Sequence, residues 1–503
     1  MTIDPKRRKQ RFSDNFYNTT TYIGVVLSLI VLFSETILFW VDFFSPSKSD
    51  YIGILAYLIL PPLLVIGFIL IPLGAKWKRE RISKGLEDKT RKAIHIDLSN
   101  PKHQNALMIF LFVTIAGMLV AAICSYKAFT YTESDRFCGV ACHQIMNPEY
   151  VAHMHSSHAK IKCVECHIGS GAGWYVHYKM AGVRMLLKKI QGTYARPIPT
   201  PVTTLRPAKE ICEECHWPGK TYNAIQIKRT YFADDPSKTP KWTIQLLMHI
   251  GGKSKDSSGI HAHMYNDNEV YYAADDEKRQ KISWVKTVSK SGEEKIYMTK
   301  TSPYKDKAPA PSKIRKMDCM DCHNRPAHHF EAPEVLINRA LEDDNISPTI
   351  PMIKAKAVEV LSKEYKSEGE AVEKIESIIT SYYIKSQVKY YATHQQKIKE
   401  AIAVIITLYK NNFFPEMKAR WDVYPYDIGH RISNGCFRCH DDEHQSKSGE
   451  IIPRACTTCH TITEQGSGDN IQKNANGLDF QHPFEDDGSW KTMNCSDCHN
   501  GGA

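Results

Sequence analysis

The sequence lacks a small-residue cleavage site behind its first apolar run, and the run is too long for a removed signal peptide, so we interpret it as a retained anchor. It also lacks a general excess of basic charge. Of the net charge of +10, eight units belong to residues 1–21 and 76–104, and the remainder gives no support for a nucleic-acid partner. A motif of two cysteines and a histidine recurs along the chain without regular spacing. This irregular spacing excludes a solenoid built from equal repeats.

Three apolar runs are long enough to cross a bilayer, namely Tyr22–Phe44, Tyr51–Leu73 and Ala106–Cys124. A helix over the first run would be about 34 Å long, against a hydrocarbon core of roughly 30 Å. We therefore predict three transmembrane helices and a lipid bilayer as a partner of the chain.

Basic residues flank these runs unevenly. Residues 1–21 carry five Lys or Arg against two Asp, and residues 76–104 carry nine against four Asp or Glu. The short loop 45–50 holds only Lys48 and Asp50. The positive-inside rule therefore places the N-terminus and the 76–104 loop in the cytoplasm. Everything after the third run then lies outside the bacterial inner membrane, in the periplasm.

Fourteen of the 15 cysteines form seven pairs, and a histidine directly follows the second cysteine of each pair. Six pairs have the strict C-x-x-C-H spacing, which suits two thioether bonds to haem with the adjacent imidazole reaching the iron. Disulfides or structural zinc would not require a histidine at that position each time. We therefore predict seven covalently attached c-type haems, held by Cys138, Cys142 and His143; Cys163, Cys166 and His167; Cys212, Cys215 and His216; Cys319, Cys322 and His323; Cys436, Cys439 and His440; Cys456, Cys459 and His460; and Cys495, Cys498 and His499.

The first motif departs from this spacing, because three residues separate Cys138 from Cys142. We still count it as a haem site, since two thiols beside His143 would otherwise have no role, but formation of both thioethers is left open there. Met146 follows His143 by three residues, and either its sulfur or an open position would complete the first iron.

Coordination by two histidines needs a second ligand for each iron and favours electron transfer over the binding of small molecules. Of the histidines outside the motifs, His95 and His103 fall on the cytoplasmic side. We select those in short polar loops near a motif: His158, His261, His328, His430, His444 and His482. His263 and His329 compete with their neighbours, and every choice competes with a surface or packing role. We expect His394, in a helical run, to be structural, and four remain open: His153, His155, His177 and His249.

The predicted fold is mainly α, with three transmembrane helices and a periplasmic multihaem domain of short helices and loops that contains a β-rich insertion. Lys281–Thr301 alternates polar and apolar residues around a hairpin turn at Ser291-Gly292, whereas residues 331–414 have a helical pattern. We expect haem to supply much of the core. The predicted parts are a basic tail (1–21), two transmembrane helices (22–74), a cytoplasmic basic loop (75–104), a third transmembrane helix (105–130), a three-haem domain (131–219), the insertion (220–315), a fourth haem with a helical segment (316–430) and a C-terminal three-haem segment (431–503).

From the third apolar run to residue 216 the sequence resembles the NapC/NirT family of membrane-anchored multihaem cytochromes c, which are quinol dehydrogenases. The shared residues are Cys142-His143-Gln144-Ile145-Met146, Glu149-Tyr150, Ser157-His158, Cys163-Val164-Glu165-Cys166-His167, Lys179, the stretch 197–201 and Cys212-Glu213-Glu214-Cys215-His216. With three membrane helices and seven motifs, the whole chain looks like the inner-membrane cytochromes with which metal-reducing bacteria oxidise menaquinol.

The resemblance implies a quinol site beside the haem nearest the membrane, with a methionine near that iron and a lysine that contacts the quinol. Met146 and Lys179 stand at those positions. The family's acidic partner, six or seven residues after the lysine, is missing, because Met185 and Leu186 stand there. Glu35, in the outer half of the first membrane helix, is a candidate replacement that would accept a quinol proton, since carboxyls in membranes are costly and often functional. Pairing of Glu35 with a neighbouring helix is the alternative.

The expected function is that of a quinol dehydrogenase in anaerobic or extracellular respiration. Menaquinol would be oxidised at the outer face of the membrane, and electrons would pass along the haems to a soluble periplasmic multihaem cytochrome or reductase. One alternative is a non-catalytic electron-transfer subunit of a larger respiratory complex. Another is a terminal reductase of a small nitrogen compound, which would need an iron with one open face. The oligomeric state and the direction of electron flow are left open.

Overall fold

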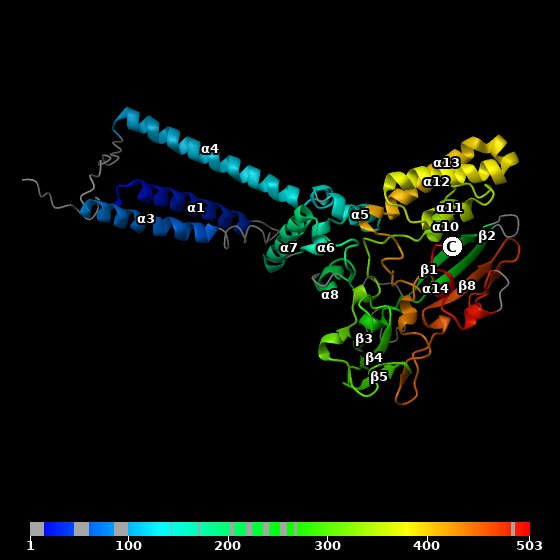
Figure 1. Cartoon of the computed structure of the whole chain (residues 1–503). Helices are drawn as coiled ribbons and strands as arrows, with labels where there is room; N and C mark the ends of the chain where they lie inside the picture. The colour runs from blue at the N-terminus through cyan, green and yellow to red at the C-terminus, as the bar shows by residue number, and fades with distance from the viewer. Residues whose placement is uncertain are drawn as a thin grey trace, which may run out of the picture. The chain divides into compact units, whose positions relative to one another are not determined.

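The computed structural model describes residues 15–44, 60–84, 99–141, 143–169, 172–201, 206–217, 224–234, 241–251, 259–265, 269–483 and 488–502. Predictions made for residues 1–14, 45–59 and 85–98 lie outside these ranges. The chain forms two compact units, one of Met1–Tyr131 with Ile168–Gly182 and one of Thr132–His167 with Val183–Ala503. The first unit holds α1 (Thr19–Phe44), α3 (Leu60–Ser83), nearly all of α4 (Pro101–Thr132) and the start of α7 (Ala172–Gln191) (Figure 1).

Two of the three expected membrane spans are found among the described residues. Thr19–Leu38 and Leu60–Ser83 are long and apolar enough to cross a bilayer. The third, expected over Ala106–Cys124, falls within α4, but among the described residues two helices and not three are long and apolar enough to cross a membrane. α3 also runs on to Ser83, so the first part of the expected cytoplasmic loop is helical.

Helices α1 and α3 lie side by side (Figure 1), and small residues let their backbones approach closely. A Cβ on Gly24 would lie 2.7 Å from the carbonyl oxygen of Gly67, and a Cβ on Gly67 would clash with Ser28 Oγ. Thr21 Oγ1 donates to the carbonyl of Ile71 at 3.1 Å across the pair. Contacts between small residues are typical of helices that pack within a membrane, where lipid provides no hydrophobic driving force between them.

Replacing Gly67 with leucine is expected to destabilise this helix pair by about 1–3 kcal/mol, the usual cost of overpacking. Gly182→Leu is the matched control, because Gly182 is also helical but an added Cβ meets nothing in the described chain within 4 Å. That control should be neutral or slightly stabilising, since leucine favours helix over glycine. Thermal unfolding of the detergent-solubilised protein, followed by circular dichroism, measures both. Equal stability of the two variants would contradict the close approach of α1 and α3.

Four helices of the second unit build a large apolar core (Figure 1): α10 (Pro333–Glu342), α11 (Ile353–Ser362), α12 (Glu368–Ser386) and α13 (Val388–Asn412). They occupy the segment for which the sequence predicts helices. Ser367 caps α12 by accepting a hydrogen bond from the Glu370 amide at 3.2 Å. Ile375, Ile379 and Tyr383 recur every four residues and are fully buried, as the inner face of an amphipathic helix requires. In this segment the core consists of apolar side chains.

Two antiparallel sheets lie in the second unit, with strand orders β1–β2–β8–β9 and β6–β3–β4–β5–β7. The insertion is β-rich as predicted, and the β4–β5 hairpin turns at Gly292, whose φ is +82°. Neither sheet is confined to the insertion, because β8 pairs with β2 and β7 pairs with β5. The strands are β1 (Ile225–Phe232), β2 (Lys241–Met248), β3 (Glu269–Ala274), β4 (Ile282–Val288), β5 (Glu294–Met298), β6 (Arg315–Lys316), β7 (Gln445–Ser446), β8 (His460–Gly466) and β9 (Gln472–Lys473).

Candidate functional site

Six of the Cys-Cys-His motifs lie on or beside short helical turns of the second unit. In four of them the histidine amide donates to the carbonyl of the first cysteine: His216 to Cys212 (2.7 Å), His323 to Cys319 (2.8 Å), His440 to Cys436 (3.0 Å) and His499 to Cys495 (2.8 Å). Residues four apart on a turn share one side, so each turn gathers its thiols and imidazole. The elements are α6 (Cys163–His167), α8 (Ala208–Cys212), η6 (Cys319–Asp321), η8 (Gly435–Arg438), η9 (Cys456–Thr458) and α14 (Cys495–Cys498).

The extra residue of the first motif is accommodated by a π-helical turn, η3 (Phe137–Ala141). Such turns arise where one residue is inserted into a helix. A Cβ on Gly139, inside the motif, would clash with the ring of Tyr150, so this position requires glycine. Cys142 and the side chain of His143 lie outside the described residues.

Each motif histidine whose side chain is described faces a histidine from outside the motifs. Two imidazoles on opposite faces of one metal, each with a nitrogen about 2 Å from it, place their ring centres roughly 6 Å apart. Rings that stack directly in this chain are closer, at 3.8 Å for His329–Tyr426 and 4.2 Å for Tyr390–His394. The facing pairs are His158–His216 (6.1 Å), His167–His328 (6.1 Å), His261–His323 (6.3 Å), His263–His440 (6.0 Å), His430–His460 (6.2 Å) and His482–His499 (6.1 Å).

The hydrogen bonds of four of these twelve rings also suit iron. In these four, Nδ1–H donates to a backbone carbonyl, which leaves the lone pair on Nε2, as in most metal-binding histidines. Burial lowers the pKa of His167 and of His430 to about 4, so both rings are neutral near pH 7, as a metal ligand must be. The residues therefore fit haem iron between each pair. The Nδ1 bonds run from His158 to Pro326 (3.2 Å), His263 to Ile260 (2.8 Å), His328 to Glu149 (3.0 Å) and His440 to Pro453 (2.9 Å).

Of the six predicted distal histidines, only His444 has no place in these pairs. Its Nδ1 lies 2.9 Å from Asp441 Oδ1, and its buried Nε2 has no hydrogen-bond partner among the described residues. His263, which the sequence offered only as a competitor of His261, faces His440 instead. Local spacing favoured His444, four residues after His440, whereas only the fold brings position 263 to that motif.

The ring neighbours of three other histidines are also known. His329 stacks on Tyr426, and His394 stacks on Tyr390 at a kink in α13, which agrees with the structural role expected for His394. His153 is buried with its ring centre 6.1 Å from that of His328. His328 therefore has two histidine neighbours, His153 and His167.

A buried ion pair fixes the backbone that orients His328. Arg325 donates to both carboxylate oxygens of Glu149, at 2.9 and 3.1 Å, and lies over the ring of Tyr424. The carbonyl of the same Glu149 accepts the Nδ1–H of His328. Sequence reasoning quoted Glu149 only through the family resemblance and missed Arg325. The signal that could have found it is its place between His323 and His328.

Cysteines of each motif interact with cysteines of the next motif along the chain. The thiols stand where thioether bonds would attach haem, so these interactions mark neighbouring sites. Two of the interactions are hydrogen bonds, Cys138–Cys163 and Cys212–Cys319, and the others are electrostatic, Cys166–Cys215, Cys322–Cys436, Cys436–Cys459 and Cys456–Cys495. The sites therefore follow one another in chain order.

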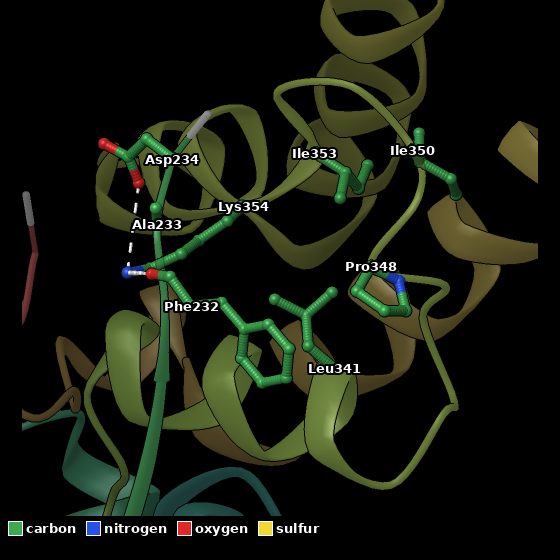
Figure 2. Close-up of a pocket in the computed structure, with 8 residues that line it drawn as sticks. All are labelled: Phe232, Ala233, Asp234, Leu341, Pro348, Ile350, Ile353 and Lys354. Atoms are coloured by element: carbon green, nitrogen blue, oxygen red, sulfur yellow. Dashed lines mark hydrogen bonds and ion pairs between the residues drawn. The ribbon is translucent and has the colours of Figure 1, made fainter. Parts of the chain in front are cut away.

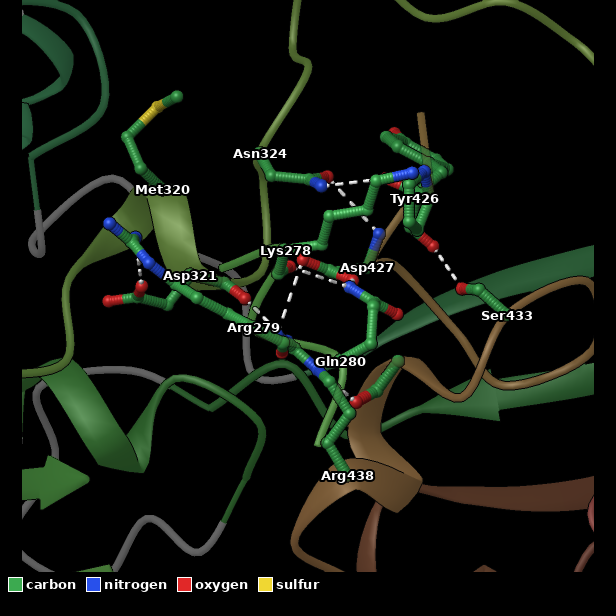
Figure 3. A network of polar contacts seen from close by, with 12 residues as sticks. Lys278, Arg279, Gln280, Met320, Asp321, Asn324, Tyr426, Asp427, Ser433 and Arg438 are labelled. Carbon is green, nitrogen blue, oxygen red and sulfur yellow. Dashed lines mark hydrogen bonds and ion pairs between the residues drawn. The ribbon is translucent and has the colours of Figure 1, made fainter. Parts of the chain in front are cut away.

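A buried polar network ties the fourth motif to the fifth (Figure 3). Asp321, inside the fourth motif, accepts hydrogen bonds from Tyr272 at 2.6 Å and from Arg315 at 2.8 Å. Arg438, inside the fifth, donates to the carbonyl of Asp321 at 2.6 Å and pairs with Asp427 at 3.3 Å. Buried charges are tolerated only when they are paired and hydrogen-bonded, so this network fixes the two motifs relative to each other.

The cavity in Figure 2 is too small for a substrate. Its volume is about 10 Å³, space for roughly one water molecule. Lys354 donates to the carbonyl of Phe232 and pairs with Asp234 at 3.9 Å, and burial lowers the pKa of this lysine. The contacts join α11 to the end of β1 and have a structural role.

The residues expected at a quinol site lie on three helices. Glu35 on α1 and Lys179 on α7 belong to the first unit, and both are half-buried. Met146 lies on α5 (His143–Met154) in the second unit, where it packs against the apolar core. Their roles in quinol chemistry stay predictions.

Repeated haem-attachment motifs behind an apolar anchor define a class of protein, the membrane-anchored multihaem cytochromes c of electron transport. A family model described as the NapC/NirT cytochrome c family, N-terminal region, matches residues 100–197. The chain is 36% identical over 485 residues to the cytochrome c-type protein ImcH of Geobacter sulfurreducens, covering 96% of this chain and 95% of that protein. This chain belongs to the NapC/NirT cytochrome c family.

A shorter match supports the same family. The chain is 32% identical over 111 residues to the cytochrome c-type protein NrfH of Wolinella succinogenes, which covers 22% of this chain and 62% of that protein. No solved structure matches the chain.

Proposed function

We propose that this protein oxidises menaquinol at the outer face of the bacterial inner membrane. It would then pass the electrons through seven haems to a soluble periplasmic multihaem cytochrome or reductase. The observation that supports the proposal is the series of Cys-Cys-His motifs in which cysteines of consecutive motifs interact, in a chain whose N-terminal part holds apolar helices.

The histidine pairs favour conduction over reduction of a small molecule. Covalently bound haem supplies an iron that takes up and releases one electron at a time. At six sites a motif histidine faces a second histidine, and two such ligands would leave the iron no open face. A terminal reductase of a nitrogen compound would need such a face, so we do not favour that alternative.

The first site differs from the others and is the natural place for quinol. Its motif directly follows α4 in the sequence, and the family resemblance assigns Met146 to the vicinity of its iron and Lys179 to contact with the quinol. An ammonium can hold the quinol oxygen while it loses a proton, because it stabilises developing negative charge. Glu35 would receive that proton in place of the acid that Met185 and Leu186 replace.

Stopped-flow mixing of the purified full-length protein with a menaquinol analogue tests the proposal. We expect the haems to be reduced without any added subunit, and a pyridine haemochrome assay to give seven haems per chain. Haems that dithionite reduces but the quinol analogue does not would favour a non-catalytic subunit of a larger complex. A haem count far below seven would overturn the multihaem path itself.

A further inference from the structure

One short turn carries two histidines that face different motifs. The turn, residues 259–264, overlaps α9 (Ala262–Tyr265) and follows β2 in the insertion. The ring of His261 lies 6.3 Å from that of His323 in the fourth motif, and the ring of His263 lies 6.0 Å from that of His440 in the fifth. The two histidines therefore reach neighbouring sites from one piece of backbone.

The backbone of this turn is held firmly against the end of β2. The amide of Ile260 donates to the carbonyl of His249 at 2.8 Å, and the amide of His261 donates to the carbonyl of Ile250 at 3.0 Å. Gly259 packs on Gly251 so closely that an added Cβ would lie 2.6 Å from the Gly251 nitrogen. The turn is thus part of the sheet's framework, which makes it a precise support for ligands.

At the fifth motif, both rings of the His263–His440 pair are in the tautomer that an iron ligand requires. His263 Nδ1 donates to the carbonyl of Ile260 at 2.8 Å, and His440 Nδ1 donates to the carbonyl of Pro453 at 2.9 Å. The lone pair of each ring is therefore on Nε2. The competing histidine, His444, has its Nδ1 beside Asp441, whereas the ring of His263 lies 6.0 Å from that of His440.

We propose that this single turn supplies the second axial ligand to two consecutive irons, His261 to the fourth haem and His263 to the fifth. The proposal rests on haem attachment at these motifs, but not on quinol oxidation. It gives the insertion a function, because its strands position a turn that completes the coordination of the two sites that the Asp321–Arg438 network already joins.

Axial ligation is tested on the full-length protein by replacing His263 with glycine, with His444→Gln as the matched control. We expect His263→Gly to convert about one-seventh of the ferric haem from low spin to high spin, since one motif of seven is affected. Added imidazole should restore the low-spin state by filling the vacated position. His261→Gly should give the same loss, and the double variant twice that loss. Electron paramagnetic resonance and magnetic circular dichroism measure the spin states, and a pyridine haemochrome assay measures haem content.

Two results would overturn the proposal. One is a fully low-spin His263→Gly protein with all its haems, and the other is a high-spin haem in His444→Gln. If His263→Gly fails to accumulate, His263→Met provides the second measurement. A thioether ligand should replace one bis-histidine signal by a histidine–methionine signal and raise the reduction potential of one haem. An unchanged number of bis-histidine haems in His263→Met would equally exclude His263 as a ligand. A low haem count in the unmodified protein would instead count against haem attachment itself.

Discussion

Replacing Cys319 and Cys322 with alanine is expected to leave only half of the remaining haems open to rapid reduction by a menaquinol analogue. Three motifs precede the fourth and three follow it, and interactions between their cysteines follow the order of the chain. Removing the fourth haem would therefore interrupt the path in the middle. The first three haems should still be reduced quickly, whereas the last three should stay oxidised until dithionite is added.

The matched control removes a haem from the end of the path. Cys495→Ala with Cys498→Ala also leaves six haems, but none lies beyond the break, so all six should be reduced quickly by the quinol analogue. Stopped-flow absorbance in the haem bands measures the fast amplitude of both variants. Rapid reduction of all six haems in the Cys319/Cys322 variant would show that the sites branch and do not form a single series.

Replacing Lys179 with methionine is expected to slow haem reduction by the quinol analogue by about 10- to 100-fold. That range is the rate equivalent of losing a hydrogen bond to a charged group. Lys179 is half-buried on α7, whereas Lys188 on the same helix is exposed, so Lys188→Met serves as the control and should react at the unaltered rate. Full reduction of both variants by dithionite would show that their haems are intact.

The same assay examines the proposed proton acceptor. Glu35→Gln keeps the shape of the side chain but cannot take a proton, so we expect slower reduction with unchanged haem content. Undiminished turnover in Glu35→Gln would exclude this carboxyl from the reaction. An effect of Glu35→Gln without any effect of Lys179→Met would place quinol at α1 and contradict the role carried over from the family.

The sequence alone supports a prediction of the attachment sites, because thioether chemistry confines two cysteines and a histidine to five consecutive residues in six of the motifs. The pairing of the other histidines with these motifs could be predicted only in part. His158 and His328 stand near motifs in the sequence, whereas His263 reaches His440 only through the fold. Nothing local marks His263 as a neighbour of His440, and the sequence favoured the nearer His444. The interaction between Cys212 and Cys319 was likewise hidden, because it spans the whole insertion.

Secondary structure, too, could be predicted where local patterns determine it but not where distant segments pair. The helices from Pro333 to Asn412 follow from apolar periodicity, and Gly292 marks the hairpin through its turn residues. The partners of the insertion strands could not be read, since β8 lies more than 200 residues after β2 and pairing depends on register. The helices α10 to α13 bury their own apolar side chains, which their periodicity predicts.

The register of β2 against β8 determines where the sixth motif's histidine points. His460 is the first residue of β8 and stands opposite Met248, and the His249 amide donates to the carbonyl of Cys459 at 2.9 Å. Side chains alternate between the faces of a strand, so a slip of one residue would turn the ring of His460 away from His430. A molecule that misfolded in this way would have the normal mass and could still carry all its haems, yet the sixth iron would lack its second histidine and the path towards the C-terminus would be impaired.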